Sequence, residues 1–466
     1  MTALSLVGPS YGLKFGKADN ERTINYVPVQ IESGNGKGGS PAYLKQIPGL
    51  SLLASLGSEI RGFVVARDVM YVAAGAALYR VSSSWVATNV GSLLSSSGLV
   101  GMAVNNTQIA IVDGLNLHVF DLDTSAMTTN PENWRGSDRV DVLDGYGVFQ
   151  EPGTNQFYIS ANQDFTVFDG LDFASAEGST GYCVGFIVKH RELLILKQNT
   201  GEVWQDTGGA DFAFSRNDGA NIEVGNSAVN TLQKTGGVAY WLGRDEKGGA
   251  AVFAMSAYSP QRVSSHALEE KLEGCDLSNA YAFTYHQDGL TYYVLQVADL
   301  DTTWVLEIAS GLWHERAELV NGDYTKWRAN SHVYAYGVHI VGDSTGKLYK
   351  LNTEVNANNG ETLVRDRITP HLARPDMRRQ RIGSMQIDCE VGNGLPSGQQ
   401  AQMMLRYSDD GGKTWGNWRY LTLGNIGQFK ARARANMLGS TRDRVWHIRV
   451  TDDVHCDILA AVIDEV

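Results

Sequence analysis

Apolar and polar residues alternate in short runs along most of the chain, which is the pattern of half-buried β-strands. Turns rich in glycine or asparagine separate these runs. Asp113 and Gly114, for example, lie between two β-rich segments, and an Asp-Gly pair supplies the positive φ of a tight hairpin turn. Helical periodicity is confined to residues 265–272. The pattern predicts an all-β protein built from hairpins.

One hairpin recurs at a nearly constant interval. Its second strand is a short aromatic or aliphatic segment, and the seven examples start 39, 40, 46, 49, 52 and 44 residues apart, at residues 78, 117, 157, 203, 252, 304 and 348. A four-stranded propeller blade takes about 40–50 residues. The spacing predicts a β-propeller over residues 56–355, with seven blades, or six if one hairpin pairs outside the ring. An open stack of β-meanders would expose sheet edges, so a closed ring is favoured.

Two regions lie outside the repeat. Residues 1–55 include a glycine-rich segment at 34–41 and are predicted to form an extended N-terminal arm. An asparagine-rich linker follows the propeller at 352–360. Residues 361–466 are predicted to form a C-terminal β domain resembling a sandwich.

Composition narrows the class of protein. Glycine accounts for 51 of 466 residues and only 19% of residues are charged, as expected for strands joined by tight turns. The aromatic content excludes disorder. A net charge of −12 argues against a strongly basic nucleic-acid binder. The charge is uneven, because residues 361–466 hold 15 basic and 13 acidic side chains, a net +2, which leaves −14 for residues 1–360.

The chain shows no targeting or redox signal. Its N-terminus lacks the charged and apolar regions of a signal peptide, and no apolar run approaches the roughly 18 residues that span a bilayer. We therefore expect folding in a cytoplasm without membrane insertion. The four cysteines form no C-x-x-C pair and are expected to be mostly buried free thiols.

One sequence motif is specific. Residues 408–415 fit the Asp-box pattern S-x-D-x-G-x-T-W, with Ser408, Asp410, Gly412, Thr414 and Trp415 at the defining positions. In such a turn the aspartate accepts backbone N–H groups, glycine takes the left-handed conformation, and tryptophan packs beneath the hairpin. The motif predicts a structural turn.

Catalytic chemistry has little support. The chain contains no G-x-S-x-G, H-E-x-x-H or P-loop motif, and its ten histidines are scattered. We expect no catalytic residues, no metal and no cofactor. Sialidases are propellers with several Asp boxes, an arginine triad and an F/Y-R-I-P motif, whereas this chain has one Asp box and no Arg-Ile-Pro. Because of the single Asp box, a sialidase-like glycan-binding or glycan-cleaving propeller is kept as the alternative to a structural protein.

Arginines are concentrated near the C-terminus, where 13 of the 25 lie in residues 361–466. Two clusters are candidate interface residues: Arg374, Arg378, Arg379 and Arg381, then Arg432, Arg434, Arg442 and Arg444. A subunit or partner interface is favoured because the guanidinium fork suits bidentate pairing with carboxylates. A solvated face and contact with DNA phosphates stay open as alternatives.

Several ordered segments resemble one family. They are residues 21–28, 31–37, 47–50, 142–146, 158–160, 171–177, 261–269, 378–383 and 442–445, together with the Asp-box hairpin. In this order they are similar to the packaged-DNA stabilisation proteins of short-tailed phages, the tail hub or nozzle proteins of podoviruses. The similarity spans almost the whole chain and is weakest in the blade cores.

The resemblance implies a structural virion protein of the phage tail, assembled in the host cytoplasm. It implies a hexameric ring below the portal and the head-to-tail adaptor. Such a ring extends the DNA channel, retains the packaged double-stranded DNA, and carries a needle or plug and tailspike or fibre proteins for genome ejection. In this setting residues 361–466 are expected to mediate ring contacts, so that their removal leaves a folded propeller that does not assemble.

Overall fold

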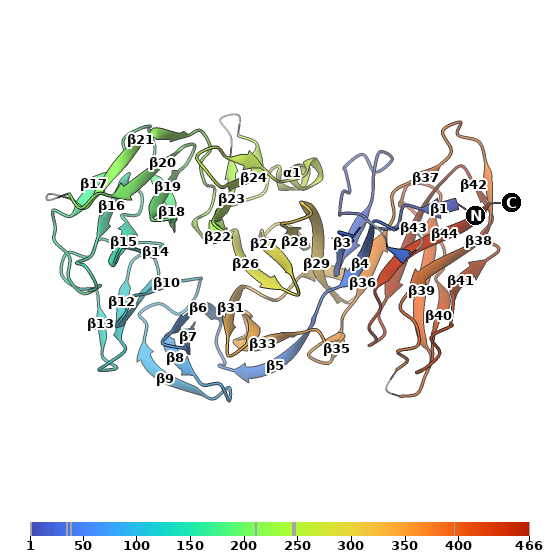
Figure 1. Ribbon diagram of the computed structural model, residues 1–466, viewed down its shortest axis with the longest axis horizontal. Coiled ribbons are helices and arrows are strands. Elements are labelled where there is room, and N and C mark those ends of the chain that lie inside the picture. The colour runs from blue at the N-terminus through green and yellow to red at the C-terminus, as the bar shows by residue number, and fades with distance from the viewer. Residues whose placement is uncertain are drawn as a thin grey trace.

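The computed structural model describes residues 2–33, 36–37, 40–209, 212–244, 248–395 and 397–465. Residues 34, 35, 38 and 39 of the predicted glycine-rich segment therefore lie outside the described residues. The molecule is elongated, with a ring of β-sheets at one end and a smaller β domain at the other (Figure 1).

The ring is a β-propeller of antiparallel four-stranded units. The first three are β6 (Ile60–Ala66), β7 (Val69–Ala74), β8 (Ala77–Val81) and β9 (Ala87–Ser92); β10 (Gly101–Val104), β11 (Gln108–Val112), β12 (Leu117–Asp121) and β13 (Met127–Thr129); and β14 (Val140–Leu143), β15 (Tyr146–Gln150), β16 (Gln156–Ile159) and β17 (Phe173–Ser175). The next two are β18 (Cys183–Lys189), β19 (Glu192–Lys197), β20 (Gly201–Asp206) and β21 (Phe214–Ile222); and β22 (Gln233–Thr235), β23 (Val238–Arg244), β24 (Ala250–Met255) and β25 (Gln261–Arg262).

The last two units are parts of larger sheets. One consists of β26 (Tyr281–Gln287), β27 (Leu290–Gln296), β28 (Thr303–Glu307) and β29 (Leu312–Val320), and the other of β31 (Ser331–Ala335), β32 (Val338–Gly342), β33 (Lys347–Asn352) and β5 (Gly49–Ser55). The inner strands β6, β10, β14, β18, β22, β26 and β31 contact one another in this order, and β31 returns to β6. The ring is therefore closed, and each of the seven repeated segments found in the sequence is the third strand of a unit.

Strand β5 closes the ring by pairing antiparallel with β33, from Ser55 opposite Lys347 to Gly49 opposite Asn352. It belongs to the propeller, although the sequence placed residues 49–55 in the arm. The hairpin pattern could not reveal this, because β5 precedes the first hairpin and pairs with a strand almost 300 residues away. The linker also adds to this sheet, since β34 (Ala357–Asn358) pairs with β5 and with β35 (Glu361–Thr362).

Packing between units explains why many strands are apolar on both faces. All five residues of β11 are buried, because neighbouring units cover both sides of the sheet. Between the fourth and fifth units, Ile187, Leu194 and Trp241 are among the buried side chains. The predicted helical turn is confirmed as α1 (His266–Leu272), which Ser265 caps by accepting the Leu268 amide. A short 3-10 turn, Val229–Thr231, precedes β22.

The second domain is a sandwich of two sheets, as predicted. One sheet contains β44 (Ile458–Glu465), β38 (Gln380–Cys389) and β41 (Ala433–Asn436). The other contains β36 (Arg365–Ile368), β43 (Asp443–Val450), β39 (Ala401–Ser408) and β40 (Arg419–Gly424). Short strands β37 (Leu372–Ala373) and β42 (Ser440–Thr441) pair with β43 and β38. Met385, Met403, Leu405, Trp446 and Ile463 fill the core between the sheets.

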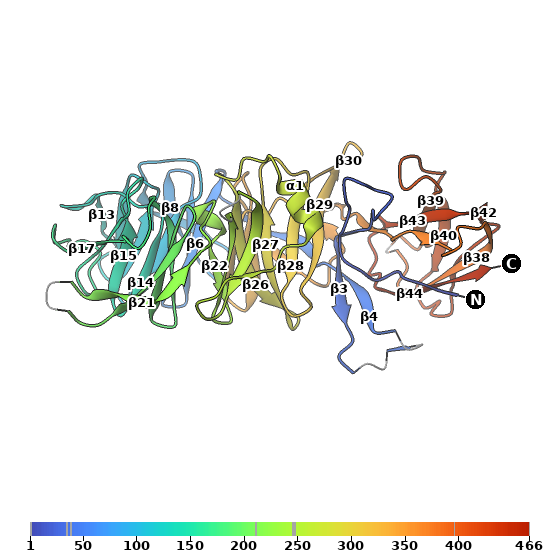
Figure 2. The same cartoon turned by 90° about the horizontal axis from the view of Figure 1, so that it is seen from above.

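The N-terminal arm is integrated into both domains instead of standing apart. Strand β2 (Arg22–Ile24) lies parallel to β29 and antiparallel to β36, so one sheet runs from the propeller into the sandwich. The hairpin of β3 (Tyr26–Gln30) and β4 (Ala42–Gln46) joins β44 and projects from one side of the molecule (Figure 2). Strand β1 (Thr2–Leu4) also pairs with β44. The arm thus fastens the two domains together.

All four cysteines, each within the described part of the chain, are free thiols, and Cys183 and Cys456 are buried while Cys275 and Cys389 are partly buried. Within the described residues, no helix has the length and apolar character needed to cross a bilayer.

Candidate functional site

The Asp box forms the turn after β39. The Ser408 hydroxyl donates to Asp410 Oδ1 (2.6 Å) and accepts the Gly412 amide (2.8 Å). Asp410 accepts the Thr414 amide (2.9 Å) and hydroxyl (2.6 Å). These bonds from Ser408 and Thr414 hold the pKa of Asp410 well below its ordinary value. Gly411 and Gly412 have φ of 76° and 88°, which glycine adopts without steric cost. The polar groups of the motif are thus used within the turn.

The tryptophan of the Asp box lies over a polar cluster and is only half-buried. The Arg406 guanidinium lies 4.9 Å from the Trp415 ring centroid and 4.2 Å from that of Trp418. Both indoles also contact His447 edge-on. Cation–π contacts of this kind stabilise a partly desolvated arginine. Trp415 therefore covers charged groups and not the hydrophobic core.

Beneath the indoles, the buried carboxylate of Asp366 collects several donors. It accepts His447 Nε2 (2.8 Å) and Arg449 Nε (2.7 Å), and also the hydroxyl of Tyr324, which comes from β30 (Asp323–Lys326) of the propeller. Burial would raise the pKa of Asp366, but His447 and Arg449 outweigh it and hold the pKa well below its ordinary value. Arg406 Nε donates to His447 Nδ1. The network joins the sandwich to the propeller.

A second buried carboxylate anchors the arm. Glu315 on β29 has no exposed surface and receives both Nε (2.9 Å) and Nη2 of Arg22 on β2, and the Thr302 hydroxyl (2.6 Å). Burial alone would raise the pKa of Glu315, but Arg22, Lys271 and Thr302 lower it to about 2. On the other side of β2, Arg367 donates to Glu21 (2.6 Å) and to the Leu6 carbonyl (2.6 Å). Buried charges at the junction are thus used to hold the arm.

Seven of the eight predicted interface arginines are exposed. They lie in the β37–β38 loop, in β38, in or beside β41, and just after β42. We call this set the arginine face, and its members are Arg374, Arg378, Arg379, Arg381, Arg432, Arg434 and Arg442. Arg374 pairs with Glu465 (2.9 Å), and Arg434 donates to Ser384 (3.0 Å). The strands β38, β41 and β42 that carry or flank most of them lie at the end of the sandwich farthest from the propeller (Figure 1).

Arg444 differs from the other seven and is not part of the surface. Its side chain is 1% exposed and pairs with Asp409 through Nε (2.6 Å) and Nη2 (2.8 Å). Its Nη1 donates to the Leu438 carbonyl, and its guanidinium stacks 3.7 Å from the Tyr407 ring centroid. The prediction of Arg444 as an interface residue is corrected, because the strand alternation in β43 turns its side chain inward.

Exposed apolar side chains accompany the arginine face, and no motif in the sequence marks them. Met377 in the β37–β38 loop is 78% exposed and Met437 in the β41–β42 turn is 86% exposed. Both have positive φ, 55° and 54°, which is uncommon for residues other than glycine. Methionine and arginine are enriched in protein interfaces. In the sequence, the only local signal for them is a methionine placed between arginines of the two clusters.

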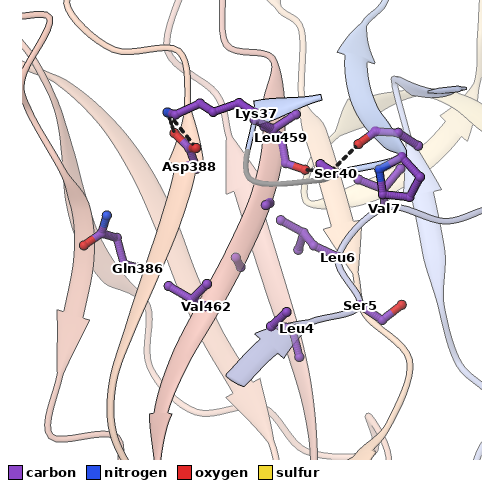
Figure 3. Close-up of a pocket in the computed structure, with 15 residues that line it drawn as sticks. Leu4, Ser5, Leu6, Val7, Lys37, Ser40, Gln386, Asp388, Leu459 and Val462 are labelled. Carbon is purple, nitrogen blue, oxygen red and sulfur yellow. Dashed lines mark hydrogen bonds and ion pairs between the residues drawn. The ribbon is translucent and has the colours of Figure 1, made fainter. Parts of the chain in front are cut away.

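A cavity of about 620 Å³ lies on the outer face of β44 and β38 (Figure 3). The chain from Ala3 to Val7 borders it on one side and the β3–β4 hairpin on another. Lys37 and Asp388 form an ion pair at its rim (2.7 Å). Most of the lining residues are small or aliphatic, and the charged ones are Lys37 and Asp388, which pair with each other.

Metal-ligating side chains were not expected from the sequence, yet one group qualifies within the described residues. Glu390, His455 and Asp457 place one donor atom each within 4.8 Å of the others. They come from two segments separated by more than 60 residues, so no spacing motif links them. The only local signal is the His-x-Asp pattern at 455–457, which puts both side chains on one face of an extended segment.

The fold and these features define a class: a β-propeller fused to a β-sandwich, with the buried carboxylates of Asp366 and Glu315 engaged in structural networks and a cluster of arginines on the surface. The chain belongs to the family of bacteriophage P22 Gp10. Residues 19–356 match the family model of the beta-propeller, a phage stabilisation protein, and residues 365–464 match that of the beta-sandwich. It is therefore a phage structural protein, as the resemblance in the sequence indicated.

The chain is also similar to solved structures, at low identity and low TM-score. They include the computationally designed Ika8 protein (13% identity, TM-score 0.38, covering 75% of this chain and 98% of that chain). Another is the N-terminal domain of Nup159, with 9% identity and a TM-score of 0.42, covering 66% of this chain and 95% of that chain. A third is the extracellular domain of BT4673 from B. thetaiotaomicron, with 9% identity and a TM-score of 0.44, covering 81% of this chain and 47% of that chain. No curated protein matches the chain.

Proposed function

We propose that this chain is the hub or nozzle subunit of a short phage tail. Six copies form a ring below the portal and adaptor, extend the DNA channel, retain the packaged genome, and carry the needle or plug and the tailspike or fibre proteins. The observation that carries the proposal is the family match across both domains, residues 19–356 and 365–464. The role is structural, without catalysis or a cofactor.

The distribution of charge supports assembly into a ring. A cyclic oligomer needs two different, complementary surfaces on each subunit. The arginine face lies at one end of the molecule, whereas the arm and propeller, residues 1–360, carry a net −14. A basic end that meets an acidic body of the next copy closes such a ring, and complementary charge fixes its register.

The same charge suits a channel for DNA. Six chains with a net charge of −12 each give a ring of about −72, which repels phosphates over roughly a Debye length. A lining of this kind lets the double helix slide, whereas a basic lining would bind it. The rigid junction between propeller and sandwich, built on β2, supports a ring that bears load.

The experiment combines a knockout with charge reversal. Virions from a phage that lacks this chain should lose their packaged DNA, and the triple variant Arg378→Glu, Arg379→Glu, Arg381→Glu should fail to restore it. Arg80→Glu, which reverses an exposed arginine on the propeller strand β8, is the matched control and should restore it. Virions that keep their DNA without the chain would contradict the role in genome retention. Normal rings of the triple variant in electron micrographs would contradict the role of the arginine face in ring assembly.

The sialidase-like alternative has no separate support. Its motivation was the Asp box, whose serine, aspartate and threonine groups bond to one another and to the backbone of their own turn. A glycan array with the purified chain tests this alternative, and the structural role predicts no binding.

A further inference from the structure

We propose that Glu390, His455 and Asp457 bind one divalent transition-metal ion, of the class of Zn²⁺, where the arm meets the sandwich. His455 Nε2 lies 3.1 Å from Glu390 Oε2 and 3.5 Å from Asp457 Oδ1. Donor atoms bound at about 2.0–2.2 Å to one zinc ion are themselves roughly 3.0–3.5 Å apart. The two distances from His455 match those around a shared ion, and all three donor atoms lie within 4.8 Å of one another.

The backbone frame holds these side chains in place. Glu390 directly follows β38, and its amide donates to the Asp457 carbonyl (2.9 Å). Asn393 donates to the His455 carbonyl (2.9 Å), and the Cys456 amide donates to Gln46 Oε1 (3.1 Å). The buried Arg365 donates to the Val454 carbonyl just before the site (2.5 Å). Little conformational freedom is therefore lost when an ion binds, which favours affinity.

The alternation of side chains completes the site. Val454 and Cys456 point into the core and are 3% and 0% exposed, so His455 and Asp457 share the outer face with Glu390. The backbone N–H of Gln46 on β4 donates to Asp457 Oδ1 (2.8 Å). This bond orients the carboxylate, as outer partners of metal ligands commonly do. Because Gln46 belongs to the arm, an ion at this place couples the arm hairpin to the sandwich.

The donor set selects the class of ion. One imidazole and two carboxylates suit zinc and neighbouring first-row metals, whereas magnesium and calcium prefer oxygen donors alone. Three protein donors leave a tetrahedral ion one position, which water can fill. The two outer ligands are accessible, since the side chains of Glu390 and His455 are 51% and 38% exposed. The ion therefore has a path to the site.

The test uses the full chain, freed of metal with a chelator and titrated with Zn²⁺ by calorimetry. The wild type should bind one equivalent, and Co²⁺ at the site should give the visible absorption of a four-coordinate ion. His455→Ala and Glu390→Gln should each weaken binding by at least about tenfold. His266→Ala is the matched control, because His266 is an exposed histidine paired with a glutamate on α1, and it should bind like the wild type.

A readout specific to the arm accompanies the titration. Zinc should raise the melting temperature of the wild type but not of His455→Ala, and should slow hydrogen exchange of the Gln46 amide. Circular dichroism without metal should be the same for all variants; if His455→Ala does not fold, the exposed Glu390→Gln alone decides. Absence of saturable binding, or binding that both variants leave unchanged, would overturn the proposal without affecting the proposed role in the tail.

Discussion

Replacing Glu315 with glutamine tests how strongly the arm is held to the propeller. The variant keeps the volume of the side chain but removes the charge that faces both donors of Arg22. Breaking a buried ion pair on one side costs about 3–5 kcal/mol, because the remaining charge loses its partner. Arg22 keeps 23% of its side chain exposed, so water compensates part of this cost. We expect a loss near the lower end of the range.

The pKa of Glu315 provides a second route to the same magnitude. Folding lowers this pKa from 4.5 to about 2, and each pKa unit corresponds to about 1.4 kcal/mol. A carboxyl group with a lower pKa in the folded state stabilises that state above its unfolded pKa and loses the contribution as the pH falls toward the folded pKa. The charge of Glu315 thus contributes about 3 kcal/mol at pH 7, and about half of that at pH 3.

The assay is urea unfolding of wild type and Glu315→Gln at several pH values. The difference in unfolding free energy should be full at pH 6–7, decrease below about pH 4.5, and become small near pH 2. Glu273→Gln, which removes an exposed carboxylate paired with Lys14, is the control and should show no measurable change. A difference under about 1 kcal/mol at pH 7, or one that does not depend on pH, would refute the reasoning.

Other variants compare buried with exposed side chains of the sandwich, and test the pairing of β5 with β33. Arg444→Ala should lower the unfolding free energy of the sandwich by about 3 kcal/mol in urea titrations, whereas Arg379→Ala should leave it unchanged. Trp446→Ala, at a site with no exposed surface, should cost about 3–5 kcal/mol by the same assay. Deleting residues 1–55 should abolish the cooperative thermal transition of the propeller, because it removes β5. Deleting residues 361–466 should preserve that transition. The reverse result would contradict the closure of the ring by β5.

Local signals in the sequence were sufficient for the repeating part of the fold. The spacing of the hairpins located the third strand of each propeller unit, because a hairpin is formed by neighbouring residues and its turn residues are diagnostic. The Asp box and the helix capped by Ser265 were recognisable for the same reason. Ordered short segments also identified the family, which the matches to both domains confirmed.

Tertiary structure alone decided the rest. The pairing of β5 with β33 and the position of β2 between β29 and β36 join segments about 290 to 350 residues apart, and no local pattern encodes such partners. Burial likewise depends on what covers a strand: Arg442 and Arg444 are two residues apart, yet one is exposed and the other lies in the core. The amino-acid sequence by itself determined the class, the repeat and the family, because these follow from short-range patterns. The closure of the ring, the joining of the domains and the convergence of Glu390 on His455 required the folded chain, because they depend on contacts between distant segments.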